Sequence, residues 1–160
     1  MSTFDDWHAI QTLLVTYAEL VDAGRLAEAA ALFEHATYRV VRDDVPDPVH
    51  AQGSAEVEQF FAITRLYPDG TPRTKHVITN VDIRLDGDAA SSRCTVTVFQ
   101  QTDVLPLQPI ASGHYVDRFE RVDGVWRFAE RQLRSFLHGD RSQHLLAEIG
   151  APRAEIPRSS

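Results

Sequence analysis

Tyr17 and Asp22 are two residues near the start of the chain whose chemistry a purely structural role does not explain. Tyr17 places a phenol inside a run of apolar residues, and Asp22 places a carboxylate five residues later. A phenol can donate a hydrogen bond, whereas an ionised carboxylate only accepts them. The surrounding pattern predicts a helix, whose last turn disfavours a carboxylate because it is the negative end of the helix dipole. The pair therefore marks a candidate site, for which the rest of the chain must supply a partner.

The helix that carries this pair is predicted over residues 7–24. Its apolar residues recur at spacings of three and four and so share one face; they are Trp7, Ile10, Leu13, Leu14, Tyr17, Leu20 and Val21. Asp5 and Asp6 stand at its start, where the dipole favours negative charge, and Gly24 suits the left-handed residue that ends a helix. We expect this face to pack on the core.

Two more helices and a short strand are predicted before residue 73. Alanine and leucine favour a helix over 25–33, with an apolar face made of Leu26, Ala29, Ala30 and Phe33. Residues 38–41 predict a strand. The segment Asp43 to Gly53 holds two prolines and three aspartates, which predicts a loop and a candidate lid. Ser54 is a candidate N-cap for a third helix, which the turn residues 67–72 end.

The pattern changes to that of long strands after residue 73. Four strands are predicted, over residues 74–85, 89–104, 112–122 and 125–137. Asp86-Gly87-Asp88 and Asp123-Gly124 suit tight hairpin turns, and Pro106 to Pro109 makes a wider connection. Strands of this length exceed the usual five or six residues, so the sheet should be strongly bent.

The turn at Asp123-Gly124 also predicts a register. If Val122 pairs with Val125, strict alternation puts four aromatic residues on one face; they are Tyr115, Phe119, Trp126 and Phe128. The same register makes Asp117 and Glu130 cross-strand neighbours, which a charge network with nearby arginines would neutralise.

Composition limits the partners and the location. The chain has 160 residues, 43% apolar and 24% charged, with a net charge of −7, as expected for one soluble domain. This charge argues against nucleic acid and anionic membranes, which select basic surfaces. The single cysteine, Cys94, cannot form an internal disulfide. Without a long apolar run or a signal-like start, the expected location is the cytoplasm.

Helices followed by a meander of strands predict an α+β fold. We expect a cone-shaped α+β barrel, with three N-terminal helices packed on a strongly bent, mostly antiparallel sheet and a pocket between them. Residues 1–137 would form a single domain, and residues 138–160 a tail with a short helix around Ser142 to Ile149.

Three stretches then carry a resemblance. They read D-A-G-R-L-A-E-A-A-A-L-F at 22–33, T-K-H-V-I-T-N-V at 74–81 and Y-V-D-R-F-E-R-V-D-G-V-W-R-F at 115–128. Over about residues 5 to 137 the chain resembles the SnoaL-like branch of the nuclear-transport-factor-2-like superfamily. Within it, the pattern is similar to the group of scytalone dehydratase and the bile-acid dehydratases. The matching site positions are Tyr17, Asp22 and His76.

This resemblance implies loss of water from a carbonyl compound that carries a β-hydroxyl, without metal or organic cofactor. His76, held in one tautomer by Asp22, would remove the α-proton, and Tyr17 would stabilise the enolate. The substrate-binding positions it implies are Tyr38, Phe99, Gln101 and Tyr115. Isomerisation by the same proton abstraction is the related activity. The ligand would be a small, mostly apolar polyketide, steroid or aromatic compound.

The residues also allow other interpretations. Asp22 could cap the second helix, and Tyr17 could be an ordinary core aromatic. On a strictly alternating strand, Val77, Val81, Ile83 and Leu85 share one face and His76 lies on the other. Either a β-bulge or bend near Ile78 exchanges the faces, or the apolar face is buried in a subunit contact. The second case predicts a homo-oligomer, a dimer or a trimer.

The dehydratases supply a further histidine or aspartate from the next strand, where this chain reads Phe99-Gln100-Gln101. A glutamine cannot shuttle a proton at neutral pH. A non-catalytic role therefore stays open, either as a small-ligand-binding protein or as a subunit similar to the β subunit of aromatic-ring dioxygenases. Seven histidines are present, but no common metal-site spacing is found, and His138 and His144 lie in the tail.

Overall fold

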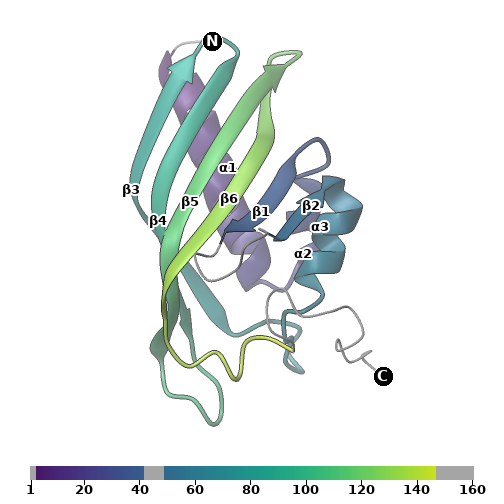
Figure 1. Ribbon diagram of the computed structural model, residues 1–160, viewed down its shortest axis with the longest axis vertical. Helices are drawn as coiled ribbons and strands as arrows, with labels where there is room; N and C mark the ends of the chain where they lie inside the picture. Colours follow the sequence, from purple (N-terminus) through teal and green to yellow (C-terminus); the bar gives the residue numbers. More distant parts are fainter. Residues whose placement is uncertain (1–2, 42–48, 147–160) are drawn as a thin grey trace.

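A six-stranded sheet, with three helices on its concave side, makes up the fold. The computed structural model describes residues 3–41 and 49–146. In chain order the elements are α1 (Thr3–Asp22), α2 (Leu26–Ala31), β1 (Thr37–Val41), β2 (Val49–Gln52), α3 (Gly53–Phe61), β3 (Thr74–Asp86), β4 (Ala89–Gln100), β5 (Gln108–Val122) and β6 (Val125–His138). The strand order is β2-β1-β6-β5-β4-β3 (Figure 1). The predicted α+β class is confirmed.

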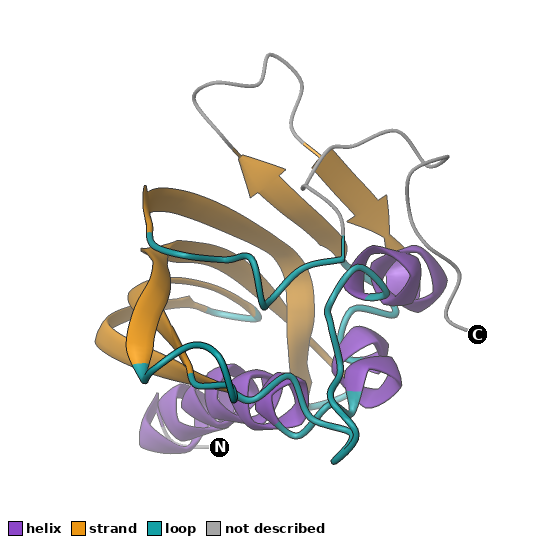
Figure 2. Ribbon diagram, turned by 90° about the horizontal axis from the view of Figure 1, so that it is seen from below, coloured by secondary structure: helices purple, strands orange, loops and turns teal. Residues whose placement is uncertain are grey.

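The sheet bends around the interior and the helices close its open side. β1 pairs with β6 in parallel, and every other pairing is antiparallel. Figure 2 shows α1 lying along the curved sheet while α2 and α3 stand beside it. The loop predicted from Asp43 to Gly53 is wrong at its end, because residues 49–52 pair with β1 as an edge strand. Its first part lies outside the described residues.

Helix α1 buries the predicted face with one exception. Ile10, Leu14, Tyr17 and Val21 are buried, but Trp7 is 38% exposed. The start of the helix instead turns Asp6 inward, where its carboxylate accepts hydrogen bonds from Trp126 Nε1 and Arg121 Nη1, each 2.8 Å long. With these two donors the buried Asp6 carboxylate is well satisfied. Asp6 thus takes the inward position at the start of the helix, and Trp7 lies at the surface.

A β-bulge divides β3 into two halves that face opposite ways. The pairing of β3 with β4 shifts between Thr79 and Asp82, and Asn80 in the bulge has a φ of 53°. Before the bulge His76 lines a cavity and Val77 is 42% exposed, whereas Val81 after it packs on the core. The predicted exchange of faces near Ile78 is therefore confirmed. The alternative, an exposed apolar face that includes Val81, Ile83 and Leu85, is wrong.

The hairpin of β5 and β6 has the predicted register near its turn. Val122 pairs with Val125 and Phe119 with Phe128, and the four aromatic residues of the predicted face are all buried. A shift between Arg118 and Phe119 then changes the register. The prediction that Asp117 and Glu130 are neighbours is wrong, because Asp117 faces Arg131 and Arg118 faces Glu130.

Several predicted element ends move by a few residues. Gln52, not Ser54, occupies the N-cap of α3, and its backbone N–H donates to Glu56 Oε2 over 2.8 Å. β4 ends at Gln100, and β5 begins at Gln108, so Pro109 lies within a strand. Proline is tolerated at the first residues of a strand, where the ladder is not yet complete. Among the described residues, no helix is long and apolar enough to cross a membrane.

The chain after β6 returns to the segment that follows α3. Leu145 forms an isolated bridge with Thr64, and Leu146 N–H donates to the carbonyl of Ile63 over 2.8 Å. The helix predicted around Ser142 to Ile149 is described only as far as Leu146, and this part consists of a turn and the bridge.

Candidate active site

Asp22 and His76 form a hydrogen-bonded pair. His76 Nδ1 lies 2.6 Å from Asp22 Oδ1, and the backbone N–H of His76 donates to Asp22 Oδ2 over 2.8 Å. Thr74 Oγ1 donates to Asp22 Oδ1, also over 2.8 Å. The His76 and Asp22 side chains are 8% and 7% exposed. The predicted partner of Asp22 is thus in contact with it, and the site combines a carboxylate with an imidazole.

The close approach of two loops positions this pair. Asp22 is the last residue of α1, and Gly24 follows with a φ of 72°. A Cβ on Gly24 would lie 1.9 Å from the carbonyl oxygen of Gly70, so only glycine lets the end of α1 meet the turn before β3. The N-cap of α2 is Arg25, without a side-chain cap. The alternative in which Asp22 caps α2 is therefore wrong.

Asp22 is ionised at neutral pH. Burial acts to raise the pKa of its carboxyl, but the hydrogen bonds and the charge of His76, together with Thr74, outweigh burial and lower that pKa below its usual value. An ionised carboxylate only accepts hydrogen bonds, so the nitrogen that carries the proton in His76 is Nδ1. In the uncharged form of the ring the lone pair is then on Nε2, and His76 lines the cavity. This is the arrangement of a general base.

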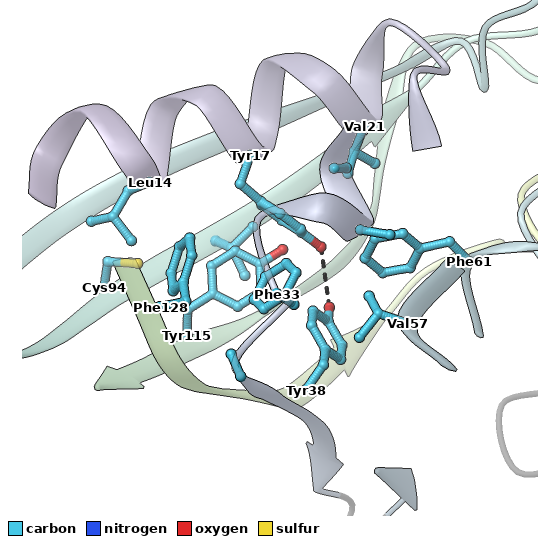
Figure 3. Close-up of a cluster of buried hydrophobic side chains, with 14 of the residues drawn as sticks. Leu14, Tyr17, Val21, Phe33, Tyr38, Val57, Phe61, Cys94, Tyr115 and Phe128 are labelled. Atoms are coloured by element: carbon cyan, nitrogen blue, oxygen red, sulfur yellow. Dashed lines mark hydrogen bonds between the residues drawn. The ribbon is translucent and has the colours of Figure 1, made fainter. Parts of the chain in front are cut away.

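Three tyrosines meet beside the cavity. The hydroxyl oxygens of Tyr17 and Tyr38 lie 3.1 Å apart, and Figure 3 shows the Tyr115 hydroxyl pointing toward the same place. Burial, with the neighbouring Tyr17, raises the pKa of Tyr38 and of Tyr115 well above the ordinary value. Both phenols are therefore neutral and able to donate hydrogen bonds to an oxygen that gains negative charge.

A buried ion pair supports these tyrosines from the core. Arg131 donates two hydrogen bonds of 2.8 Å to Asp117, and its guanidinium lies 4.3 Å from the ring centre of Tyr17 and 4.0 Å from that of Tyr115. Such cation–π contacts are strongest when water is excluded. Arg131 therefore packs against two of the three phenols that meet beside the cavity. The sequence indicated arginines near Asp117 but not this pairing.

The cavity has a volume of about 120 Å³. By the same measure one water molecule needs about 10–15 Å³, so the cavity is large enough for a small ligand. It is lined mostly by aliphatic and aromatic side chains, with Tyr17, Tyr38, Tyr115 and His76 among them. Other lining residues are Val21, Val40, Phe60, Phe61, Ile63, Val96, Val98 and Leu133. Such a lining fits a small, mostly apolar ligand.

Two predicted substrate-binding residues do not reach this cavity. Phe99 alternates along β4 with the buried Val98 and Gln100, so its side chain points to the other face of the sheet. Gln101 follows the end of β4 and is exposed. Phe99 and Gln101 therefore do not line the cavity, whereas Tyr38 and Tyr115 do.

Sequence reasoning missed two histidines of the cavity. His138, at the end of β6, and His144, beyond it, both belong to the lining. Their distance from His76 in the sequence gave no signal, because the return of the chain to Thr64 brings them there. Within residues 3–41 and 49–146, no three histidine, cysteine, aspartate or glutamate side chains lie close enough together to bind a metal ion.

The chain matches the SnoaL-like domain family over residues 2–132 and therefore belongs to it. No curated protein matches the chain. Among solved structures, it is similar to a putative scytalone dehydratase from Novosphingobium aromaticivorans, with 25% identity and a TM-score of 0.66, covering 86% of this chain and 88% of that one.

Two further structures from the same organism have the same fold. The β subunit of a putative aromatic-ring-hydroxylating dioxygenase is 20% identical, with a TM-score of 0.68 and coverage of 86% and 94%. A nuclear-transport-factor-2-like protein with a cystatin-like fold is 22% identical, with a TM-score of 0.67 and coverage of 88% and 87%. The family and fold predicted from the sequence are confirmed; the fold hosts both catalytic and non-catalytic proteins.

Proposed function

We propose that this protein is a cofactor-free lyase of the dehydratase type, or an isomerase, that removes a proton next to a carbonyl group. The observation that carries the proposal is the 2.6 Å contact between His76 Nδ1 and Asp22 Oδ1 at the wall of an apolar cavity. A base oriented in this way is suited to abstract a proton from carbon. A binding protein for apolar ligands does not need a shielded carboxylate behind a histidine.

The reaction begins when His76 Nε2 takes the α-proton. The electron pair of the broken C–H bond forms an enolate, whose oxygen accepts hydrogen bonds from the hydroxyls of Tyr17 and Tyr38. Asp22 stabilises the imidazolium that forms. In dehydration, the C–O bond at the β-carbon then breaks as the C=C bond forms, and the proton on His76 leaves with the hydroxyl as water. In isomerisation, His76 returns the proton to another carbon.

The lining limits the substrate to a small carbonyl compound with an apolar body, such as a polyketide, steroid or aromatic intermediate. Aliphatic and aromatic side chains surround the tyrosine hydroxyls and His76, so the polar groups of a ligand are expected at that end. The cytoplasm remains the predicted location. A homo-oligomer, dimer or trimer, also remains a prediction, although most of the apolar residues of β3 on which it was based pack against the core. No partner other than this ligand is proposed, in keeping with the net charge of −7.

The alternative is a non-catalytic protein that binds such a ligand or acts as a subunit similar to a dioxygenase β subunit. Its support is the similarity of fold to the β-subunit structure. In this alternative, the Asp22–His76 pair would only hold the end of α1 against β3.

A β-hydroxy ketone tests the proposal. 3-Hydroxy-1-tetralone loses water to give fluorescent 1-naphthol, so its turnover can be followed directly. We expect the wild-type protein to accelerate this reaction, and Asp22→Asn and His76→Ala each to reduce the acceleration at least about a hundredfold. His35→Ala removes an exposed histidine outside the cavity and should have no effect. Full activity in a folded Asp22→Asn or His76→Ala variant would overturn the mechanism.

A further inference from the structure

His144 contributes a polar side chain to the cavity that the reaction above does not use. Its side chain lines the same cavity as that of His76. Its Nδ1 is buried and has no hydrogen-bond partner among the described residues. An unpaired buried nitrogen costs about 1–3 kcal/mol. Such a cost in a binding cavity points to a ligand atom as the partner.

Main-chain hydrogen bonds hold the segment that carries this ring. The carbonyl of His144 accepts a hydrogen bond of 2.8 Å from the backbone N–H of Arg65, and the N–H of His144 donates to Arg141 over 2.9 Å. One residue later, Leu145 forms the bridge with Thr64. These main-chain bonds fix the Cα atom of His144 at the cavity before a ligand binds, which reduces the cost of ordering this segment.

Gln100 also holds the segment that carries His144. Its Nε2 donates to the carbonyls of Pro72 and Gln143, both over 3.0 Å. The hydroxyl of Tyr67 also donates to the Gln143 carbonyl, over 2.8 Å. Gln100 thus anchors the residue next to His144 instead of facing a ligand.

The protonation state of the His144 imidazole limits what it can do. Burial lowers the pKa of His144 to about 4, and the charges of His76 and Arg141 act in the same direction, whereas Asp22 opposes them. The imidazole is therefore neutral at pH 7. A neutral imidazole has one N–H and one lone pair, so it can form a hydrogen bond with a hydroxyl group.

We infer that His144 is a substrate-binding residue of this site, which holds the β-hydroxyl of the substrate by a hydrogen bond while His76 removes the α-proton. This inference rests on the proposed function and narrows its substrate class to β-hydroxy carbonyl compounds. His144 steadies the C–O bond in the orientation for elimination and takes no proton itself. The hydroxyl leaves as water with the proton that His76 took from the α-carbon.

Two ketones separate the roles of the two histidines. 3-Hydroxy-1-tetralone requires both proton removal and loss of the hydroxyl, whereas 1-tetralone lacks the hydroxyl and reports proton removal through deuterium uptake in D₂O. His144→Ala should lower kcat/KM for dehydration about a hundredfold and leave deuterium uptake within about twofold of wild type. His35→Ala serves as the histidine control, and His144→Asn, which keeps an N–H donor, should recover part of the dehydration rate.

The outcomes are distinct. No deuterium uptake by the wild-type protein would overturn the proposed function itself. Uptake together with unchanged dehydration in His144→Ala, or equal losses in both reactions, would overturn the role of His144. The wild-type protein gives an independent readout, because the imidazole NMR signals of His144 should shift on adding 3-hydroxy-1-tetralone more than on adding 1-tetralone. Equal shifts with the two ketones would contradict the inference.

Discussion

Arg131 and Asp117 form an ion pair in the centre of the protein, with two hydrogen bonds of 2.8 Å and both side chains at 0% exposure. Burial acts to lower the pKa of Arg131, but the attraction of Asp117 outweighs it and raises that pKa above its usual value. The guanidinium lies against the rings of Tyr17 and Tyr115. This pair therefore links the packing of the core to the phenols of the site.

We expect the loss of either member of this pair to be costly. Arg131→Met leaves a buried carboxylate without its partner, which costs about 3–5 kcal/mol of unfolding free energy. The double change Arg131→Met with Asp117→Leu removes both charges, so it should destabilise the protein less than the sum of the single changes. Urea unfolding followed by circular dichroism measures these values. A loss below about 1 kcal/mol in Arg131→Met would contradict the importance given to the pair.

Acid should destabilise the protein partly through His144. Its pKa is about 4 in the folded protein, against about 6.5 in an unfolded chain. Between these values the unfolded chain binds a proton that the folded protein does not, so the unfolding free energy falls as the pH drops from about 6.5 to 4. A shift of this size corresponds to about 3 kcal/mol. Asp22, with a lowered pKa, loses its contribution only at lower pH.

The measurement is the urea midpoint at a series of pH values for the wild type and for His144→Ala. The variant cannot gain this proton on unfolding, so its stability should fall less steeply between pH 6.5 and 4. The control is His35→Ala, whose exposed imidazole should leave the slope unchanged. Identical slopes for wild type and His144→Ala would show that the His144 ring is not shielded in the folded protein.

The bulge at Asn80 gives a further prediction. Its φ of 53° is accessible to asparagine and glycine but strained for a β-branched residue. Asn80→Val should lower the unfolding free energy by about 1–2 kcal/mol, whereas Asn80→Gly should be close to neutral. Chemical denaturation compares them at an exposed position, where side-chain packing matters little. Equal stabilities of the two variants would contradict the strained backbone at the bulge.

Local patterns predicted most of the fold. Spacings of three and four in α1, the turn at Asp123-Gly124 and the alternation around it gave the helix, the hairpin and its aromatic face. The exchange of faces near Ile78 was expected as one of two alternatives, but the exact positions of the register shifts in β3 and between β5 and β6 could not be predicted from the sequence. Neither Asn80 nor Arg118 stands out locally, because a bulge depends on how the bent sheet meets the helix below it.

Some residues of the site could be predicted from the sequence and others could not. Tyr17, Asp22 and His76 were expected from a family pattern, and the bulge at Asn80 explains why His76 faces inward despite its place in the alternation. His144 could not have been predicted, since its position depends on a bridge to Thr64 far away in the chain. Long-range returns of this kind leave no periodic signal in the sequence.

The central claim is that Asp22 and His76 act together as a base for a proton on carbon. Deuterium uptake from D₂O at the α-carbon of 1-tetralone, followed by NMR, tests it most directly because it involves no later step. We predict that the wild-type protein accelerates uptake and that Asp22→Asn, although folded, slows it about a hundredfold or more, as does His76→Ala. Uptake at the wild-type rate in Asp22→Asn, or no acceleration by the wild-type protein, would contradict the claim.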